Sequence, residues 1–208
     1  MDTIKITWHG HACFTVEYDG YVIAIDPYDP TTPGYNPLCL TAHMTLCSHS
    51  HHDHSYLQAV CMPLCERECP FEITEISTFH DDAEGAKRGE NTVHVLTAAG
   101  MRIVHLGDLG HPLSDEQAAI IGTPDVLIIP VGGYYTIDAK QADAIARRLG
   151  AKIVIPMHYR SDTFGYENIG RVEEFTALRR DVRELDTNTL ELTPKTSAMT
   201  ALLRYMGE

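Results

Sequence analysis

The chain has 208 residues, of which 44% are hydrophobic, so it can bury the core of one large domain and has no room for a second catalytic module. Its 16 basic and 29 acidic residues give a formal net charge of -13, which argues against binding to nucleic-acid phosphates or to an anionic membrane. We therefore expect one domain over residues 1–208 that acts on a small-molecule substrate, without a nucleic-acid or membrane partner. Homo-oligomer formation stays open.

The N-terminal stretch, MDTIKITWHG, lacks the basic, apolar and small-residue pattern of a signal peptide. No apolar run approaches the roughly 20 residues that a membrane span needs. These two observations predict a cytoplasmic protein. Its 6 cysteines are then expected to be free thiols, because disulfides persist mainly in oxidising compartments.

The first part of the chain predicts antiparallel strands. Residues 4–7 alternate apolar and polar side chains, and residues 12–18 and 21–28 flank Asp19-Gly20, a strong hairpin-turn signal. A loop rich in Pro, Gly and Thr follows, and the stretch from Asp29 to Pro37 is the best candidate for a lid. The run AHMTLCS then predicts a short strand that ends at a loop rich in histidine.

The stretch CMPLCEREC carries Cys61, Cys65 and Cys69, a spacing that would place the three thiols on one face of a helix. Pro63 and Pro70 interrupt any helix there, and three thiols are too few for a cluster site. A dedicated cysteine metal site is therefore disfavoured.

The second part of the chain alternates strands with helices. A capping box from Ser114 to Gln117 starts a short helix. Apolar residues at helical spacing predict two more helices, over residues 137–150 and from Val172 to Leu185. Strands are expected over residues 91–98, 101–108, 124–133, 151–159, 189–193 and 201–206. This mixture predicts two sheets packed face to face with helices outside.

Residues 49–54 form the pattern His-x-His-x-Asp-His. Residues two apart on an extended segment point the same way, so His49 and His51 could bind one ion while a turn brings Asp53 and His54 toward a second. Imidazole and carboxylate ligands suit zinc, iron or manganese. Two ions need further ligands, and His80, Asp108 and His158 are candidates because each follows a predicted strand.

This set of ligand-type residues resembles the metallo-β-lactamase-fold hydrolases, whose metal motifs occur in the same order. The stretches WHGHACF, FHDDAEGAKRGENT, HLGDLGH, PVGGYYTID and IPMHY make the chain more similar to a short branch that includes the lactonase acting on ascorbate 6-phosphate. The resemblance covers nearly the whole chain and implies an α+β fold, a four-layer αββα sandwich. It also implies that His49, His51 and His80 hold one ion, that Asp53, His54 and His158 hold another, and that Asp108 bridges them.

The expected function is hydrolysis of a small ester, lactone, amide or phosphoester by metal-bound hydroxide. Two divalent ions, zinc first with manganese or iron as alternatives, would lower the pKa of a bound water from about 15.7 toward about 7. Asp53 is expected to orient the hydroxide or to take up a proton, and His11 to stand at the metal rim. The expected substrate contacts are Tyr134, Tyr135, Arg160 and Asn91.

The remaining histidines receive structural assignments. His43, His94 and His105 lie within predicted strands and are expected to be structural, while His52 is expected to face solvent. His9 and His111 are weaker candidates for a place near the site.

Two other functions compete with the hydrolase. An iron-dependent oxidoreductase or dioxygenase could use the same ligand frame, since fold does not fix chemistry. A non-catalytic metal-binding protein ranks third. A nuclease is disfavoured because the acidic chain shows no basic exosite.

Overall fold

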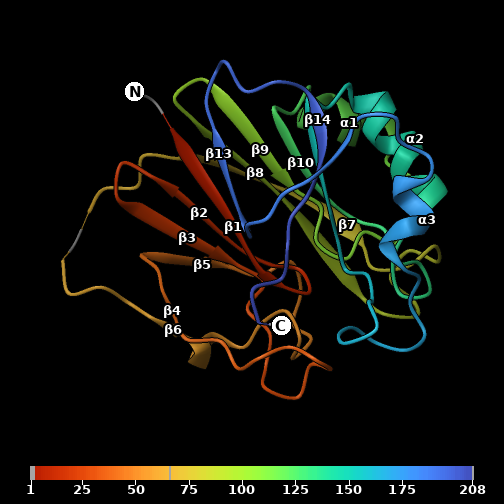
Figure 1. The fold of residues 1–208 in the computed structure, drawn as a ribbon, viewed down its shortest axis with the longest axis horizontal. Helices are drawn as coiled ribbons and strands as arrows, with labels where there is room; N and C mark the ends of the chain where they lie inside the picture. The colour runs from red at the N-terminus through yellow and green to blue at the C-terminus, as the bar shows by residue number, and fades with distance from the viewer. Residues whose placement is uncertain (1–2, 66, 208) are drawn as a thin grey trace.

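Two β-sheets lie face to face in the computed structural model, which describes residues 3–65 and 67–207 (Figure 1). The first sheet has five strands in the order β13-β1-β2-β3-β5. Its strands are β1 (Ile4–Gly10), β2 (Cys13–Tyr18), β3 (Tyr21–Ile25), β5 (Met44–Leu46) and β13 (Thr189–Leu192). All pairs are antiparallel except β3 with β5.

The predicted hairpin at Asp19-Gly20 is confirmed. β2 and β3 pair antiparallel with Tyr18 opposite Tyr21, and both turn residues have positive φ, 50° and 71°. Positive φ at both central positions is the geometry of a type I′ turn, which matches the twist of the flanking strands.

The second sheet has seven strands in the order β12-β14-β11-β10-β9-β8-β7. Its strands are β7 (Glu72–Phe79), β8 (Glu90–Ala98), β9 (Met101–His105), β10 (Val126–Pro130), β11 (Ile153–Met157), β12 (Val182–Glu184) and β14 (Met199–Leu202). From β9 to β12 the pairs are parallel, whereas β7, β8 and β9 form antiparallel pairs. Every residue of β10 and β11 is buried, as expected for central parallel strands covered on both faces.

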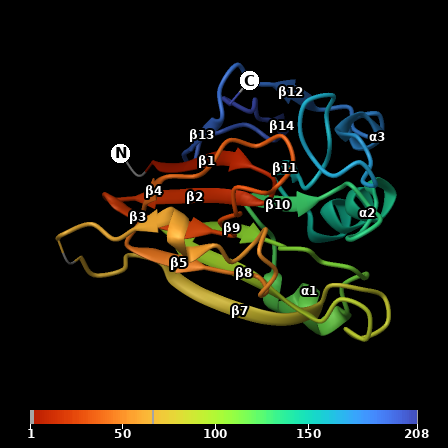
Figure 2. The same cartoon turned by 90° about the horizontal axis from the view of Figure 1, so that it is seen from below.

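Three α-helices in the described part of the chain, α1 (Asp115–Ile121), α2 (Ala139–Leu149) and α3 (Val172–Thr176), lie on the side of the seven-stranded sheet away from the five-stranded one (Figure 1). The capping box of α1 forms between Ser114 and Gln117, as predicted. The small elements β4 (Leu40–Thr41), η1 (Leu57–Ala59) and β6 (Val60–Cys61) lie beside the first sheet (Figure 2). The α+β sandwich predicted from the sequence is confirmed.

The helix predicted from Val172 to Leu185 is wrong in its second half. α3 ends at Thr176, and Val182 begins β12, which pairs in parallel with β14. Helical spacing of a few apolar residues coincided here with a strand at the edge of the sheet, where backbone pairing decided the conformation. The last predicted strand, residues 201–206, is also displaced, since β14 begins at Met199 and ends at Leu202.

No helix in the described ranges is both long enough and apolar enough to cross a membrane.

Candidate metal centre and its pocket

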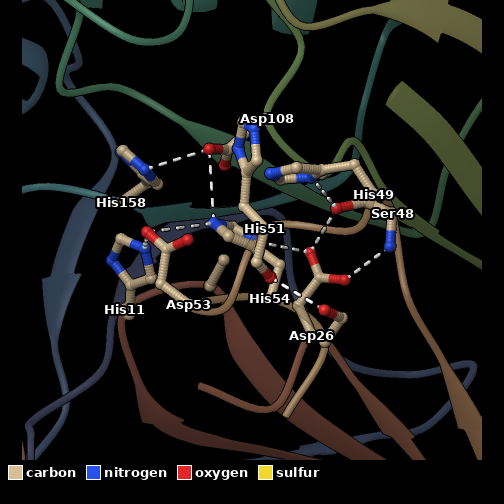
Figure 3. A network of polar contacts seen from close by, with 12 residues as sticks. His11, Asp26, Ser48, His49, His51, Asp53, His54, Asp108 and His158 are labelled. Atoms are coloured by element: carbon tan, nitrogen blue, oxygen red, sulfur yellow. Dashed lines mark hydrogen bonds and ion pairs between the residues drawn. The ribbon is translucent and has the colours of Figure 1, made fainter. Parts of the chain in front are cut away.

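Three strands of the second sheet end at residues that meet the histidine loop. His80 directly follows β7, Asp108 follows β9, and His158 directly follows β11. The Asp108 carboxylate lies where they converge: its Oδ2 is 3.2 Å from His54 Nε2, 3.3 Å from His80 Nε2 and 3.2 Å from His158 Nε2. Figure 3 shows the His54 and His158 rings directed at Asp108. Residues far apart in the sequence thus share one buried carboxylate.

The imidazole and carboxylate atoms fall into compact groups in which all ligand atoms lie within 4.8 Å of one another. The members are His49, His51 and His80 in one group, His11, His54 and His158 in a second, and His49, His54 and Asp108 in a third. The third group shares a histidine with each of the other two, so two ions could sit side by side with Asp108 next to both.

The grouping differs from the sequence-based expectation at one position. Within the part of the chain that the structure describes, Asp53 belongs to none of the groups, and His11 takes its place beside His54 and His158. Asp53 Oδ2 lies 3.3 Å from His11 Nε2 and 4.0 Å from His54 Nε2, and it accepts a hydrogen bond from the Tyr166 hydroxyl at 3.1 Å. Asp53 therefore stands at the border of the cluster, toward the pocket.

Asp26, which directly follows β3, holds the histidine loop from behind. Its Oδ1 accepts from the Ser48 backbone N–H at 2.6 Å, and its Oδ2 accepts from the Ser48 hydroxyl at 2.7 Å and lies 2.9 Å from His54 Nδ1 (Figure 3). A carboxylate at Nδ1 fixes the ring orientation and leaves Nε2 as a ligand atom. Sequence reasoning missed Asp26, because an aspartate before proline at a strand end reads as a turn residue.

Several imidazoles in the cluster are held neutral. Burial lowers the pKa of His11 to about 4 and that of His49 to about 3, in each case helped by neighbouring histidines. Burial also lowers the pKa of His80. A neutral imidazole keeps the lone pair that a metal ion binds, so these rings are in the protonation state that a ligand requires.

In contrast to these neutral imidazoles, Asp108 and His54 are held in their charged forms. Burial acts to raise the pKa of Asp108, but His158 and His54 outweigh it and hold the pKa well below its ordinary value. Burial likewise acts to lower the pKa of His54, yet Asp108 and Asp26 outweigh it and raise that pKa well above its usual range. Positive charge is thus favoured between the two carboxylates, at the place where a cation would lie.

Unpaired buried ligand atoms are a second indication that these residues hold a metal ion. Among the described residues, buried atoms that form no hydrogen bond include Nε2 of His11, His49 and His54 and Oδ1 of Asp108. Buried polar atoms are normally satisfied, so such a concentration calls for an explanation such as an ion. Histidine nitrogens and carboxylate oxygens are ligands for zinc, iron or manganese.

Backbone strain accompanies the cluster. His11, Asp26 and His158 have φ values of 49°, 50° and 54°, a left-handed conformation that residues other than glycine seldom adopt. Each such residue costs about 1–3 kcal/mol, and such residues concentrate at functional sites. The turn at His11 follows Gly10, where a Cβ would clash with the Tyr35 ring.

Asn91 supports Asp108 from within the sheet. It is buried, its Oδ1 accepts from the Asp108 backbone N–H at 2.8 Å, and its Nδ2 donates to Thr78 Oγ1 at 2.7 Å and to Leu106 O at 3.0 Å. The expectation that Asn91 contacts substrate is therefore wrong: its polar atoms are occupied, and it positions the loop that carries Asp108. Gly107 lies so close that any Cβ there would clash with Asn91 Oδ1.

A pocket of about 380 Å³ opens over the cluster. It is lined by His51, His52, Asp53, His80, Lys87, Arg88, Asp108, Tyr135, His158 and Tyr166. Tyr135 lies where the sequence analysis expected it. His52 is exposed, as predicted, and it also contributes to the pocket wall.

Two other predicted substrate contacts lie elsewhere. The Tyr134 side chain is 64% exposed and does not line the pocket. Arg160 lines a separate hollow beside Gly34 and Phe164, and its Nε donates to Ile169 O at 2.8 Å. The chain turns away immediately after His158, so adjacency in sequence did not bring Arg160 to the pocket. The loop from Asp29 to Pro37 does not line the pocket either.

The pocket also contains residues that the sequence analysis did not single out, namely Tyr166, Lys87 and Arg88. Lys87 and Arg88 lie inside the quoted stretch FHDDAEGAKRGENT, so their presence near His80 was a usable signal. Tyr166 offered none, because its hydroxyl reaches Asp53 across 113 positions of sequence.

Four of the remaining histidines have hydrogen-bond partners, whereas His94 is buried in β8 with its Nδ1 3.7 Å from Glu75 Oε1. His105 Nε2 lies 2.9 Å from Ala12 O, and its Nδ1 accepts from the Gly107 backbone N–H. His43 Nδ1 accepts from Val22 N, and His111 Nε2 accepts from Phe79 N, next to His80. His9 Nε2 lies 2.9 Å from the Thr15 hydroxyl, and His9 belongs to none of the described ligand groups.

The cysteines form no such centre. All six are free, and Cys61, Cys65 and Cys69 are exposed. None of the three described groups of possible ligands contains a cysteine. The expectation of free thiols is confirmed.

Residues 5–158 match the model of a family described as the beta-lactamase superfamily domain. A protein from Methanoculleus marisnigri named as a UPF0173 metal-dependent hydrolase is 27% identical over 230 residues, covering 96% of this chain and 93% of its own length. Another of that name from Thermoplasma volcanium is 27% identical and covers 76% of this chain and 84% of its own length.

Solved structures give the same picture. A protein from Thermotoga maritima, assigned by name to the Zn-dependent hydrolases of the metallo-beta-lactamase superfamily, is 35% identical, with a TM-score of 0.75 and coverage of 96% of this chain and 97% of the other. A metallo hydrolase from Ignicoccus hospitalis, 23% identical with a TM-score of 0.64, covers 93% of this chain and all of the other, and shows likeness of fold alone.

Proposed function

This chain belongs to the beta-lactamase superfamily, and from that membership we propose that it is a metal-dependent hydrolase that uses two divalent ions, zinc first, to cleave a small ester, lactone, amide or phosphoester. The narrower likeness to the lactonase of ascorbate 6-phosphate stays a prediction. The names of the relatives support the coarse activity and leave the substrate open.

The observation that carries the proposal is the position of Asp108 Oδ2, which lies 3.2–3.3 Å from the Nε2 atoms of three histidines that belong to the two outer ligand groups. One carboxylate oxygen among three imidazoles suits a carboxylate shared by neighbouring ions. His49, His51 and His80 would hold one ion and His11, His54 and His158 the other. The ions, when bound, supply Lewis acidity that lowers the pKa of a water to about 7 and polarises the substrate oxygen.

The residues at the pocket wall would handle the proton. Burial acts to raise the pKa of Asp53, but His11 and His54 outweigh it, so its carboxylate is ionised at neutral pH. Asp53 Oδ2 can then take a proton from the attacking water and return it to the leaving group. The Tyr166 hydroxyl, which donates to that oxygen at 3.1 Å, holds it in place, and His11 Nε2 lies 3.3 Å from it. Tyr135 lines the same pocket.

The test is the metal content of the purified protein by elemental mass spectrometry, with a His49→Ala/Asp108→Ala double variant in parallel. We expect about two zinc or manganese ions per chain, a large loss in the variant, and hydrolysis of small lactones or phosphoesters by the wild type alone. The folding control is the near-UV circular dichroism of both proteins.

Other outcomes would change the proposal. Iron as the dominant metal together with oxygen consumption would favour the oxidoreductase. Two bound ions without hydrolysis over a broad substrate panel would favour a non-catalytic metal-binding protein. Equal metal contents in wild type and variant would remove these residues as ligands.

A further inference from the structure

Two cations stand at the pocket in a protein whose formal net charge is -13. Lys87 and Arg88 are the lysine and arginine that line the pocket, and its other titratable residues besides the tyrosines are two aspartates and four histidines. Both cations come from residues 81–89, which follow His80 in the connection between β7 and β8. Basic side chains at this place oppose the charge of the molecule as a whole and would attract an anion into the pocket.

The connection that carries them is held in a fixed shape by Asp81, a buried residue next to His80. Its Oδ1 accepts from the backbone N–H groups of Ala83 at 2.7 Å and Gly85 at 3.0 Å. Its Oδ2 accepts from the backbone N–H groups of Lys87 at 2.9 Å and Arg88 at 2.7 Å. One carboxylate thus fixes the backbone from which both cations project, so little ordering would be needed when a ligand binds.

Arg88 is the more available of the two cations. Lys87 Nζ already lies 2.6 Å from Asp82 Oδ1 in an exposed ion pair. Arg88 forms no ion pair with a carboxylate in residues 3–65 and 67–207. It donates through Nη2 to Tyr134 O at 2.9 Å, and its guanidinium carbon lies 5.5 Å from the centre of the Tyr135 ring. These contacts orient the guanidinium, and its other N–H groups have no acceptor among the residues that the structure describes.

We infer that the pocket binds a substrate with an anionic group, a phosphate or a carboxylate, which Arg88 holds while the bond to be cleaved lies over the cluster around Asp108. This inference rests on the proposed function and names the substrate class for the same site. A guanidinium presents parallel N–H donors that match both anions, whereas the ammonium of Lys87 would add an unspecific positive charge at the rim. A volume of about 380 Å³ restricts the substrate to a small molecule.

The first test measures binding without turnover. Isothermal titration calorimetry would compare methyl phosphate and acetate on metal-loaded wild type, Arg88→Gln, Arg88→Lys and Arg183→Gln proteins. Arg183 is an exposed arginine of β12, at the opposite edge of the same sheet from β7, and serves as the matched control. We expect Arg88→Gln to weaken at least one anion by roughly tenfold or more, since charge-assisted hydrogen bonds are strong.

The anion that loses affinity identifies the group that Arg88 recognises. Arg88→Lys keeps the charge but lacks the planar guanidinium, so its loss of anion affinity should be smaller than that of Arg88→Gln. Partial affinity in Arg88→Lys would show that the effect comes from recognition of the anion and not from loss of folding. The inference is overturned if neither anion is weakened by Arg88→Gln, or if Arg183→Gln weakens binding equally.

The second test uses two esters with the same bond to be cleaved, monomethyl succinate and dimethyl succinate, together with a phosphate-bearing lactone and the same lactone with a free hydroxyl. Arg88→Gln should raise KM for the anionic member of a pair roughly tenfold and leave the neutral member within about twofold. Hydrolysis of neutral and anionic members that is equally insensitive to Arg88→Gln would overturn the inference and leave the hydrolase proposal standing. Without hydrolysis of any compound the hydrolase proposal fails, and the calorimetry still decides the anion site.

Discussion

Residues 47–56 and residues 61–69 both carry dense runs of metal-ligating side chains, but only the first run folds into a buried cluster. The histidine loop is anchored by Asp26 through Ser48 and His54 and meets residues from three strands of the other sheet. The thiols of Cys61, Cys65 and Cys69 are exposed. The difference teaches that ligand-type residues become a site only where buried partners orient them and other strands complete the set.

Among the substitutions in the histidine loop, removal of the Asp53 carboxylate is expected to have the largest effect on catalysis. Asp53→Ala should lower kcat by about 100- to 10,000-fold, because the pocket loses the carboxylate proposed to move the proton. Since Asp53 stands outside the three ligand groups, metal content measured by mass spectrometry should stay near that of the wild type. Loss of metal would instead make Asp53 a ligand, and unchanged turnover would remove it from the mechanism.

The anchor of the loop provides the next comparison. Asp26→Asn keeps the shape of the side chain but removes the charge at His54 Nδ1, so we expect metal affinity to fall by about 10- to 100-fold. Competition with a fluorescent chelator would measure the change. An affinity equal to that of the wild type would show that burial alone orients His54.

The loop of residues 81–89 is also held by a buried aspartate, and its contribution to stability is expected to depend on pH. Burial acts to raise the pKa of Asp81, but backbone N–H groups, with Arg88 and Ala83 the strongest, lower it from 3.8 to about 2. A carboxyl group whose pKa falls on folding stabilises the native state above its unfolded pKa, and this contribution disappears as the pH falls from about 4 to about 2. Asp81→Asn should therefore lower Tm at neutral pH, with a difference from wild type that shrinks over that window. A pH-independent difference in Tm would contradict the role of the Asp81 charge.

The smallest effect is expected in the cysteine run. A Cys61→Ser/Cys65→Ser/Cys69→Ser protein should keep the metal content and kcat of the wild type, because these exposed thiols join none of the described ligand groups. Substitutions at exposed positions usually change stability by no more than about 0.5 kcal/mol. Loss of bound metal in this variant would mean that the two loops are not as different as their geometry indicates.

The sequence predicted those parts of the site that local pattern determines. The spacing from His49 to His54 and the strand ends at His80, Asp108 and His158 were sufficient to bring together most of the cluster, because strand ends converge at one edge of a sheet. His11 could be placed near it but not within a ligand group, since that depends on the left-handed turn after Gly10.

The errors arose where long-range contacts decide the outcome. Arg160 lies only two residues after His158, yet the backbone turns it into another hollow. Asn91 has the side chain of a substrate contact, but the fold uses all of its polar atoms within the protein. Val182 was predicted to lie in a helix because the spacing of the apolar residues around it suits one. Its pairing with β14 at the edge of the sheet cannot be read from that spacing.

The left-handed backbone at His11, Asp26 and His158 lowers the thermal stability of the fold at residues that the proposed activity requires. Glycine or asparagine would adopt these conformations with less strain, so a library selected only for thermal survival should drift toward those residues at His11 and His158. Asp26 should be kept, because its carboxylate accepts hydrogen bonds from the buried Ser48. Selection for hydrolysis should drive the same positions back. Comparing the substitutions in the library selected for thermal survival with those in the library selected for hydrolysis would show how much stability the protein loses by keeping the site.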